Sequence, residues 1–472
     1  MRIVMFSITP LFPDIIMGGA QKHIQDIALY LGGQGHEITI LCTRRDDDHR
    51  PFRWQDRVEV KPILRFRQPF PQPYATPAHH LAAIVQDVGE HLQNADRFYL
   101  HDGEFVFPYV YRHIPTVVSL RDNVYPETLQ GAFLFGGDAL ILISDYARRH
   151  YLHTVGRFFP GLEEKIVVIP NGFDRERFKP TPPRRIRELI PSVDPQKHAI
   201  VLHPHRPETN KGLRETVQVV DLLVHRHGLS NVRALVPKWI PEAASLEVNA
   251  FYAGIEREIA ERGLGEHFVF HDWVPPDLMA EYYTLGDVTL SLGSFPEAFG
   301  NAVYESLGCG TPSIAARVTT HREILPDHLL DKVDFGDVES AAAIAAQIIR
   351  EKRRTSPETL AYLREHYSFE RMLKRYADVI LNARLTEKLT YRLTPIGGET
   401  RFTLAPWCYF SERRGLYHDF RADYRPADAL RSVSEKYPQG FTFEEAARHG
   451  LSCEEVMAWY REGYLVPVAD GG

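Results

Sequence analysis

The chain has 472 residues, which is enough for two or three domains with buried cores. Its composition, 44% hydrophobic and 25% charged, is that of an ordinary globular protein. The formal net charge of −7 excludes a global basic field that would recruit nucleic acid or an anionic membrane. We therefore expect no nucleic-acid partner, and any phosphate site has to be local.

We infer the cellular compartment of the protein from three patterns that the sequence lacks. No uncharged apolar run is long enough to span a bilayer, and the strand after Met1 carries no signal-peptide cleavage pattern. The four cysteines have neither metal-ligand nor disulfide-framework spacing, which fits a reducing compartment. We expect a cytoplasmic protein without a transmembrane segment or a metal centre.

The first half of the chain alternates apolar strands with amphipathic helices: a strand at 3–8, a helix at 21–31 and a strand from 38. This order favours a parallel α/β sheet whose ligand-binding loops follow the carboxyl ends of its strands. Gly18 and Gly19 stand in the first such loop and would let the backbone approach a diphosphate, although glycine also suits a plain turn there. The loop lacks G-x-G-x-x-G, so a dinucleotide site is not indicated.

Residues 44–80 are predicted to have irregular structure and to form part of the surface on the acceptor side. The Asp46–Asp48 run within them is predicted to be solvated surface. Strands at 98–101 and 116–120 follow. Arg121 stands at the end of the second, where its permanent cation suits a carboxylate or a phosphate. The alternative for Arg121 is a surface pair with Asp122 or a structural salt bridge.

A second α/β domain is predicted after the Pro-rich linker at 181–183. A strand at 199–202 leads into a loop that contains Arg206 and Lys211, and a helix begins at Leu213. Two cations, a glycine and a helix N-terminus form a local phosphate trap. Solvated surface charge is the alternative.

The most informative stretch, 293–312, reads GSFPEAFGNAVYESLGCGTP and follows an apolar strand at 288–292. It predicts strand, tight turn and helix N-terminus, with Glu297 in the turn and Glu305 in the helix. Each carboxylate can accept hydrogen bonds from adjacent hydroxyls, as a sugar or a ribose presents them. Solvated loop and helix acids are the alternative.

This stretch resembles the E-x7-E signature of the retaining family-4 glycosyltransferases, through Ser294, Pro296, Phe299-Gly300, Glu305, Gly308 and Gly310-Thr311-Pro312. The resemblance covers about residues 1–384. It implies an α/β fold of the GT-B type, with two Rossmann-like domains facing across a cleft, at 1–180 and 181–384.

Residues 385–472 lie beyond the resemblance. Helices are predicted near 442–449 and 452–462, and a short strand at 463–466. This order resembles a small winged-helix-like extension. Its helices are rich in Glu, which disfavours nucleic acid and leaves a protein- or peptide-binding role or packing against the core.

The resemblance also assigns roles to residues. It implies catalytic roles for Glu297, Arg206, Lys211 and Arg121, and nucleotide-sugar contacts from Gly18, Gly19, Glu305, Phe299, Gly300, Asn301 and Val274. Glycogen-synthase-like enzymes, which the first half resembles, commonly have histidine where this chain has Arg121. Because of that departure, we expect either the donor sugar or the way in which the protein holds it to differ from those enzymes.

The predicted function is a metal-independent, retaining glycosyltransferase without a cofactor. Its donor would be a nucleotide-diphospho-sugar, a UDP-sugar first and a GDP-sugar second; its acceptor would be a small molecule, a glycan or a peptide. Two alternatives stay open at this point: a nucleotide-sugar 2-epimerase on the same fold, and a non-catalytic protein that binds a sugar nucleotide or a partner.

Overall fold

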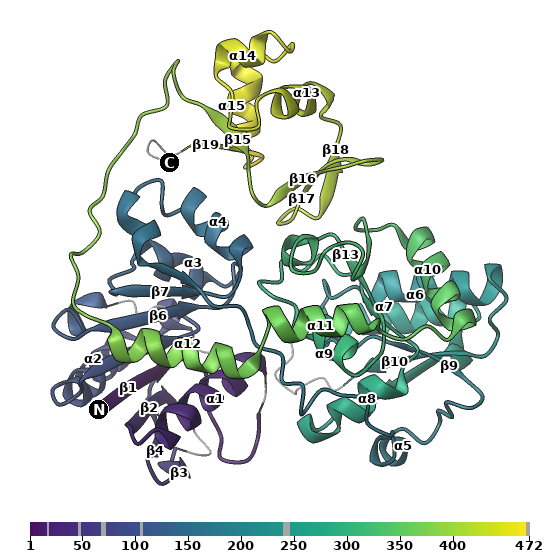
Figure 1. The fold of residues 1–472 in the computed structure, drawn as a ribbon, viewed down its shortest axis with the longest axis horizontal. Helices are drawn as coiled ribbons and strands as arrows, with labels where there is room; N and C mark the ends of the chain where they lie inside the picture. The colour runs from purple at the N-terminus through teal and green to yellow at the C-terminus, as the bar shows by residue number, and fades with distance from the viewer. Residues whose placement is uncertain (17, 46–48, 68–71, 104–106, 239–245, 469–472) are drawn as a thin grey trace. The chain divides into compact units, whose positions relative to one another are not determined.

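The computed structural model describes residues 1–16, 18–45, 49–67, 72–103, 107–238 and 246–468; Asp46–Asp48 lies outside these ranges. The chain forms two compact units (Figure 1). Unit 1 combines Met1–Pro170 with Arg371–Gly472, and unit 2 is Asn171–Glu370. The domain divisions at residues 180 and 384 stay predictions.

Unit 1 is built on an eight-stranded sheet in the order β3-β4-β2-β1-β5-β6-β7-β8, parallel except for the antiparallel pair β3–β4. The strands are β1 (Arg2–Ser7), β2 (Glu37–Thr43), β3 (Phe52–Gln55), β4 (Val58–Leu64), β5 (Arg97–His101), β6 (Thr116–Leu120), β7 (Ala139–Leu142) and β8 (Ile166–Val168). The helices are α1 (Gly19–Gly33), α2 (Ala78–Leu92), α3 (Pro126–Phe133), α4 (Asp145–His153) and α12 (Phe369–Asn382). The strand order reverses between β1 and β5, and in such sheets the reversal marks the binding crevice.

The prediction that residues 44–80 are irregular was wrong. They contain β3 and β4, and α2 begins at Ala78. Strand β4 alternates buried and half-buried residues, the pattern of a strand with one face on the core, and it pairs in parallel with β2. Pro62 within the strand and the Arg- and Pro-rich sequence around it concealed this period-2 pattern.

Unit 2 is an all-parallel sheet in the order β11-β10-β9-β12-β13-β14. The strands are β9 (Ala199–Leu202), β10 (Val232–Pro237), β11 (Phe268–His271), β12 (Val288–Ser291), β13 (Ser313–Ala316) and β14 (Asp331–Val333). The helices are α5 (Arg185–Leu189), α6 (Leu213–Asp221), α7 (Leu246–Glu261), α8 (Met279–Leu285), α9 (Asn301–Gly308), α10 (Val338–Glu351) and α11 (Pro357–His366).

Both faces of the unit 2 sheet are buried. Along β9, Val201 packs in one apolar cluster, whereas Ile200 and Leu202 pack in another, as alternating side chains of a covered strand do. Strand order reverses between β9 and β12, so the loops that follow these two strands lie side by side. Single-turn segments complete the two units: η1 (Pro73–Ala75), η2 (Pro108–Val110), η3 (Pro160–Lys165), η4 (Leu222–Arg226), η5 (Gly265–His267), η6 (Pro276–Leu278) and η7 (Thr319–Arg322).

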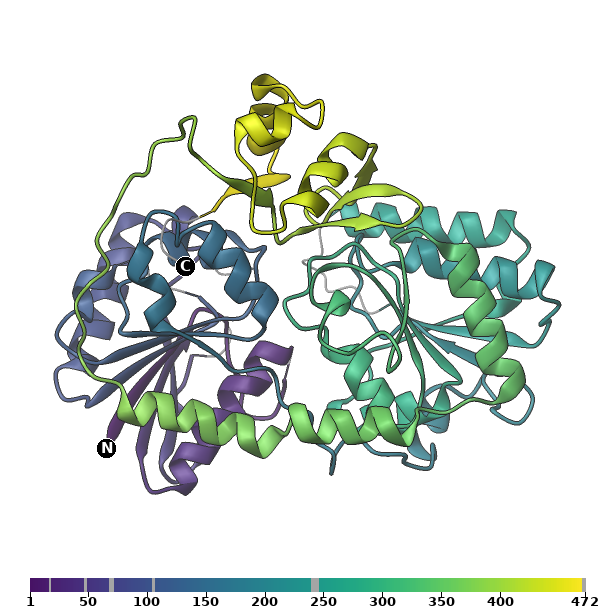
Figure 2. The same cartoon turned by 45° about the horizontal axis from the view of Figure 1, so that its top comes forward.

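Residues 402–467, the C-terminal module, follow the long segment after α12 (Figure 2), and their buried apolar side chains form one cluster together with Tyr146 of α4. The elements are β15 (Phe402–Leu404), β16 (Cys408–Ser411), β17 (Gly415–His418), β18 (Asp423–Arg425), α13 (Asp428–Lys436), α14 (Phe443–Ala447), α15 (Cys453–Arg461) and β19 (Leu465–Pro467). The predicted helix pair and following strand are present, and capping boxes at Thr442 and Ser452 start the two helices. The antiparallel sheet β16-β17-β18 and α13 were not predicted.

The module packs on α4 within unit 1. Tyr146 of α4 is 1% exposed, belongs to the module's apolar cluster and donates a hydrogen bond to Asp419 over 2.9 Å. His150, one turn later, contacts the rings of Trp407 and Phe420. Among the described residues, no helix is long and apolar enough to cross a membrane.

Candidate functional site

Two glycines bring the loops after β9 and β12 into contact in unit 2. Gly212 has φ +86°, and a Cβ atom there would lie 2.5 Å from the backbone nitrogen of Gly293. A Cβ atom on Gly293 would lie 2.4 Å from the carbonyl oxygen of Asn210. Neither position has room for a side chain, so the two backbones touch. This contact sets Lys211, on the first loop, beside Glu297 on the second.

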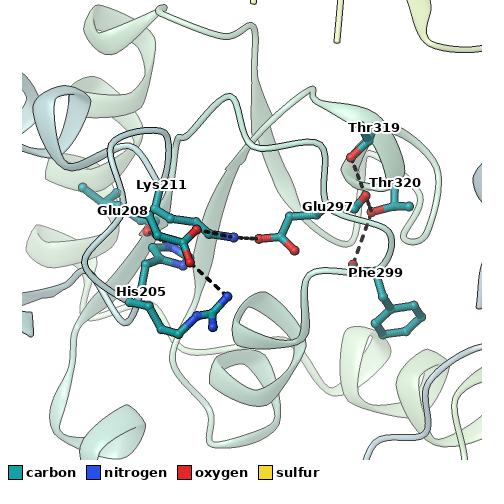
Figure 3. A network of polar contacts seen from close by, with 9 residues as sticks. His205, Glu208, Lys211, Glu297, Phe299, Thr319 and Thr320 are labelled. Atoms are coloured by element: carbon teal, nitrogen blue, oxygen red, sulfur yellow. Dashed lines mark hydrogen bonds and ion pairs between the residues drawn. The ribbon is translucent and has the colours of Figure 1, made fainter. Parts of the chain in front are cut away.

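Lys211 is the centre of a charged network (Figure 3). Its ammonium donates to Glu297 Oε1 over 2.7 Å, lies 3.8 Å from Glu208, and stands 3.4 Å above the centroid of the Phe295 ring. The lysine side chain is only 9% exposed. Arg206 is half exposed and pairs with Glu208 over 2.9 Å. The structure therefore brings together three residues predicted from sequence, and it adds Glu208 and Phe295, whose roles the sequence did not indicate.

The charge state of Glu297 is decided by Lys211. Burial raises the pKa of Glu297. The charge of Lys211 and the hydrogen bond from its ammonium lower this pKa by more than burial raises it, so the net pKa lies below the ordinary value. Nearby, burial and the charge of Lys211 lower the pKa of His205 to about 4. Glu297 is thus an ionised acceptor of hydrogen bonds, next to a neutral imidazole, at neutral pH.

The turn that carries Glu297 is also held through its backbone. Thr319 and Thr320, in η7, donate hydrogen bonds from their hydroxyls to the carbonyl oxygen of Glu297, over 2.7 and 3.2 Å. At the end of the turn Gly300 has φ +82°, and a Cβ atom there would lie 2.3 Å from the His321 ring. These residues were missed because they follow Glu297 by more than 20 positions and match no motif.

Glu305 lies on α9, which begins after Gly300. It is half-buried and accepts a hydrogen bond from the Tyr283 hydroxyl over 3.1 Å. Burial raises the pKa of Glu305, while the bond from Tyr283 and the charge of Arg177 oppose the shift. Tyr283 therefore fixes one carboxylate oxygen of Glu305, a contact that the sequence did not reveal.

Three further predicted nucleotide contacts have structural surroundings that limit what they can offer. Phe299 is buried against Tyr304, and Val274 packs in an apolar cluster, so the backbone is what either residue could present. Asn301 is exposed at the start of α9 and accepts a hydrogen bond from Asn171 over 3.0 Å.

Arg121 and the glycine pair belong to unit 1. Arg121 contacts His23 Nδ1 over 2.9 Å and the Tyr376 hydroxyl over 3.4 Å. Burial, then the charge of Arg121, lowers the pKa of His23 well below its ordinary value, so His23 is neutral. Gly18 precedes α1 in extended backbone, and Gly19 starts the helix, whose first turn has no side-chain cap at Gly18. Tyr376 is an addition that sequence reasoning did not single out.

No metal site is evident in the part of the chain that the structure describes, since no three His, Cys, Asp or Glu side chains gather as ligands there. The Asp46–Asp48 run lies outside those residues.

Comparison with known proteins defines the class. Two parallel-sheet Rossmann-like units are the GT-B architecture, and two family models match the chain, Glycosyltransferase Family 4 over residues 17–177 and Glycosyl transferases group 1 over residues 187–363. Because these matches together span most of the chain, it belongs to the family-4 glycosyltransferases. The predictions of a GT-B fold and of a glycosyltransferase family are confirmed.

Among curated relatives, the GDP-mannose-dependent alpha-(1-6)-phosphatidylinositol monomannoside mannosyltransferase of Mycolicibacterium smegmatis is 24% identical over 46% of this chain and 55% of its own length. The D-inositol 3-phosphate glycosyltransferase of Acidothermus cellulolyticus is 30% identical over 33% of this chain and 34% of its own. The chain thus matches about half, or less, of these relatives' lengths.

Solved structures agree in fold. Sucrose-phosphate synthase from Thermosynechococcus elongatus superposes with a TM-score of 0.63 at 15% identity, over 80% of this chain and 98% of its own. Anabaena HepE in complex with UDP superposes with a TM-score of 0.60 at 19% identity, over 81% of this chain and 100% of its own. At these identities the likeness shows a shared fold alone.

Proposed function

We propose that this protein is a retaining, metal-independent glycosyltransferase that moves a sugar from a nucleotide-diphospho-sugar to an acceptor hydroxyl. The observation that carries the proposal is the Lys211–Glu297 pair, held together by the contact between Gly212 and Gly293. It places a nearly buried cation and an ionised carboxylate side by side at the strand-order reversal of unit 2. A diphosphate needs the first group, and sugar hydroxyls suit the second.

The proposed roles follow from charge. Lys211 and Arg206 neutralise the negative charge that grows on the departing diphosphate, the kind of electrostatic stabilisation that usually contributes most to catalysis. Glu297 accepts hydrogen bonds from sugar hydroxyls, and Glu305 accepts them from the ribose. The diphosphate competes with Glu297 and Glu208 for the Lys211 ammonium when the donor binds.

Retention is proposed through front-face transfer. The bond from the sugar C1 to the phosphate oxygen breaks, the bond from C1 to the acceptor oxygen forms on the same face, and the acceptor proton passes to the leaving phosphate. This step needs no carboxylate nucleophile. Glu297 is committed to Lys211 through one oxygen, which suits a hydrogen-bonding role.

The donor is proposed to be a UDP-sugar, with a GDP-sugar as the second choice. Relatives support both: one is named for GDP-mannose, and HepE has been solved with UDP-glucose. The acceptor is an open choice among a small molecule, a glycan and a peptide, and the C-terminal module is proposed to position it.

The test measures turnover with a panel of UDP- and GDP-sugars and candidate acceptors. Release of nucleoside diphosphate that requires an acceptor, with the donor's anomeric configuration kept in the product by NMR, supports the proposal. A sugar epimerised at C2 without an acceptor would indicate an epimerase instead. Binding of the donor with no turnover on any pair would indicate a non-catalytic protein.

A further inference from the structure

Thr319 has an unusual backbone. Its φ of +44° lies in the left-handed region, where a β-branched residue is a genuine outlier, and the residue is completely buried. Glycine would adopt this conformation without strain. Strained residues persist only where the surrounding structure holds them, and they gather at functional sites. The reason for a threonine here therefore has to come from its side chain.

The Thr319 hydroxyl acts on the Glu297 turn. It donates to the Glu297 carbonyl oxygen over 2.7 Å, and the Thr320 hydroxyl reaches the same oxygen over a longer 3.2 Å and the Phe299 carbonyl over 3.3 Å (Figure 3). The shortest of these bonds thus belongs to the strained residue. A glycine at position 319 would remove the strain and this bond together.

The opposite side of the turn is held by its side chains. Glu297 Oε1 accepts from Lys211, whose ammonium stands above the Phe295 ring, and the Glu297 amide donates to the Phe295 carbonyl over 2.7 Å. With one carboxylate oxygen on Lys211 and the backbone carbonyl on Thr319, the position of the other oxygen, Oε2, is determined. A shift of the backbone would change where Oε2 points.

We propose that Thr319 is a positioning residue, which holds the Glu297 turn so that the carboxylate meets Lys211 and presents Oε2 to the hydroxyls of the donor sugar. The inference deepens the proposed function and rests on it. Thr319 does not touch the donor; it acts through Glu297. Its loss should therefore weaken recognition of the sugar and leave recognition of the nucleotide unchanged.

The experiment compares Thr319→Val, which keeps the branched shape and removes the hydroxyl, with Thr319→Ser, which keeps the hydroxyl. Thr359→Val is the matched control. Thr359, on α11, is also buried in unit 2, and its hydroxyl donates to the Leu329 carbonyl over 3.0 Å. We expect kcat/KM for the nucleotide-sugar to fall by roughly 10- to 100-fold in Thr319→Val, the range for a displaced catalytic group. Affinity for UDP alone should not change, and Thr319→Ser should restore activity.

Two further readouts separate positioning from general stability. In a Glu297→Gln background, Thr319→Val should add little further loss, because both changes act on one carboxylate. Thr319→Gly should unfold at a denaturant concentration no lower than the wild type, because relief of strain offsets the lost bond, and yet show the same loss of activity as Thr319→Val.

The outcomes are distinct. Activity in Thr319→Val equal to that of Thr359→Val, or an equal loss of UDP and UDP-sugar affinity, overturns the inference. If the wild type neither binds nor turns over any nucleotide-sugar, the proposed function fails. Amide hydrogen exchange of residues 293–301 then still tests whether Thr319 holds the Glu297 turn in place. Faster exchange there in Thr319→Val but not in Thr319→Ser supports it, and unchanged exchange overturns it.

Discussion

Replacing Lys211 with methionine tests the proposed diphosphate grip most directly. Methionine keeps most of the length of the side chain and its apolar character but removes the ammonium that stands above the Phe295 ring. One charge-assisted hydrogen bond contributes roughly 1.5–3 kcal/mol. At 1.4 kcal/mol for each factor of ten, kcat/KM for the nucleotide-sugar should fall about 10- to 150-fold.

The same variant should change the pH dependence of stability. In the wild type the pKa of Glu297 lies below its ordinary value of 4.5, so Glu297 stabilises the fold above that pH, and the contribution is lost as the pH falls. Without Lys211, burial is by far the largest influence left on the carboxyl and raises its pKa, so ionised Glu297 opposes folding. The difference in unfolding free energy between the two proteins should therefore grow between about pH 4 and pH 7.

The assays are steady-state kinetics, calorimetric titration with UDP and UDP-sugar, and urea denaturation across that pH range. Lys197→Met is the control, because Lys197 is a surface lysine of unit 2 with a 78% exposed side chain. Wild-type kcat/KM in Lys211→Met would remove Lys211 from the site and refute the reasoning.

Three other results are expected. Glu305→Gln should weaken UDP and UDP-sugar binding alike, by roughly tenfold, because a ribose acceptor is lost, whereas Glu297→Gln should weaken only UDP-sugar binding; calorimetry with both ligands checks this. Activity should survive EDTA, and a loss restored by magnesium or manganese would contradict the metal-independent mechanism. A chain ending at Ala383 keeps all the proposed donor-binding residues of unit 2 and should bind donor, but it should lose transfer to its native acceptor. It should also unfold more easily, since Tyr146 is uncovered. Full transfer activity would reject an acceptor role for the module.

The sequence predicted those parts of the fold and candidate site that depend on local pattern. Strands β6 and β9 have the predicted bounds, because each is a short apolar run between clear turn signals. Helix α4 has a local start signal of the same kind, since the Ser144 side chain caps it by accepting from the Ala147 amide. Helix α13 was missed because it is a short run of nine residues between turns, too brief to show a convincing period.

Contacts between distant positions could not be predicted. The bond from Thr319 to Glu297 joins residues 22 positions apart, and the contact from Arg121 to Tyr376 joins residues 255 apart. Nothing in either local sequence indicates the partner, since each pairing exists only after folding has brought distant elements together. Lys211 and Glu297 were each predicted as site residues, but their direct contact was not, and the glycine contact that produces it is visible only in the fold.

The two segments of unit 1, residues 1–170 and 371–472, are separated in the chain by all of unit 2. During synthesis, the face of α4 around Tyr146 emerges early, whereas the C-terminal module that covers it is made only after all of unit 2. At 5–20 residues per second, that face waits roughly 15 to 60 s for its cover. Throughout that interval, Tyr146 and His150 of α4 lack the residues of the module that cover them in the folded protein.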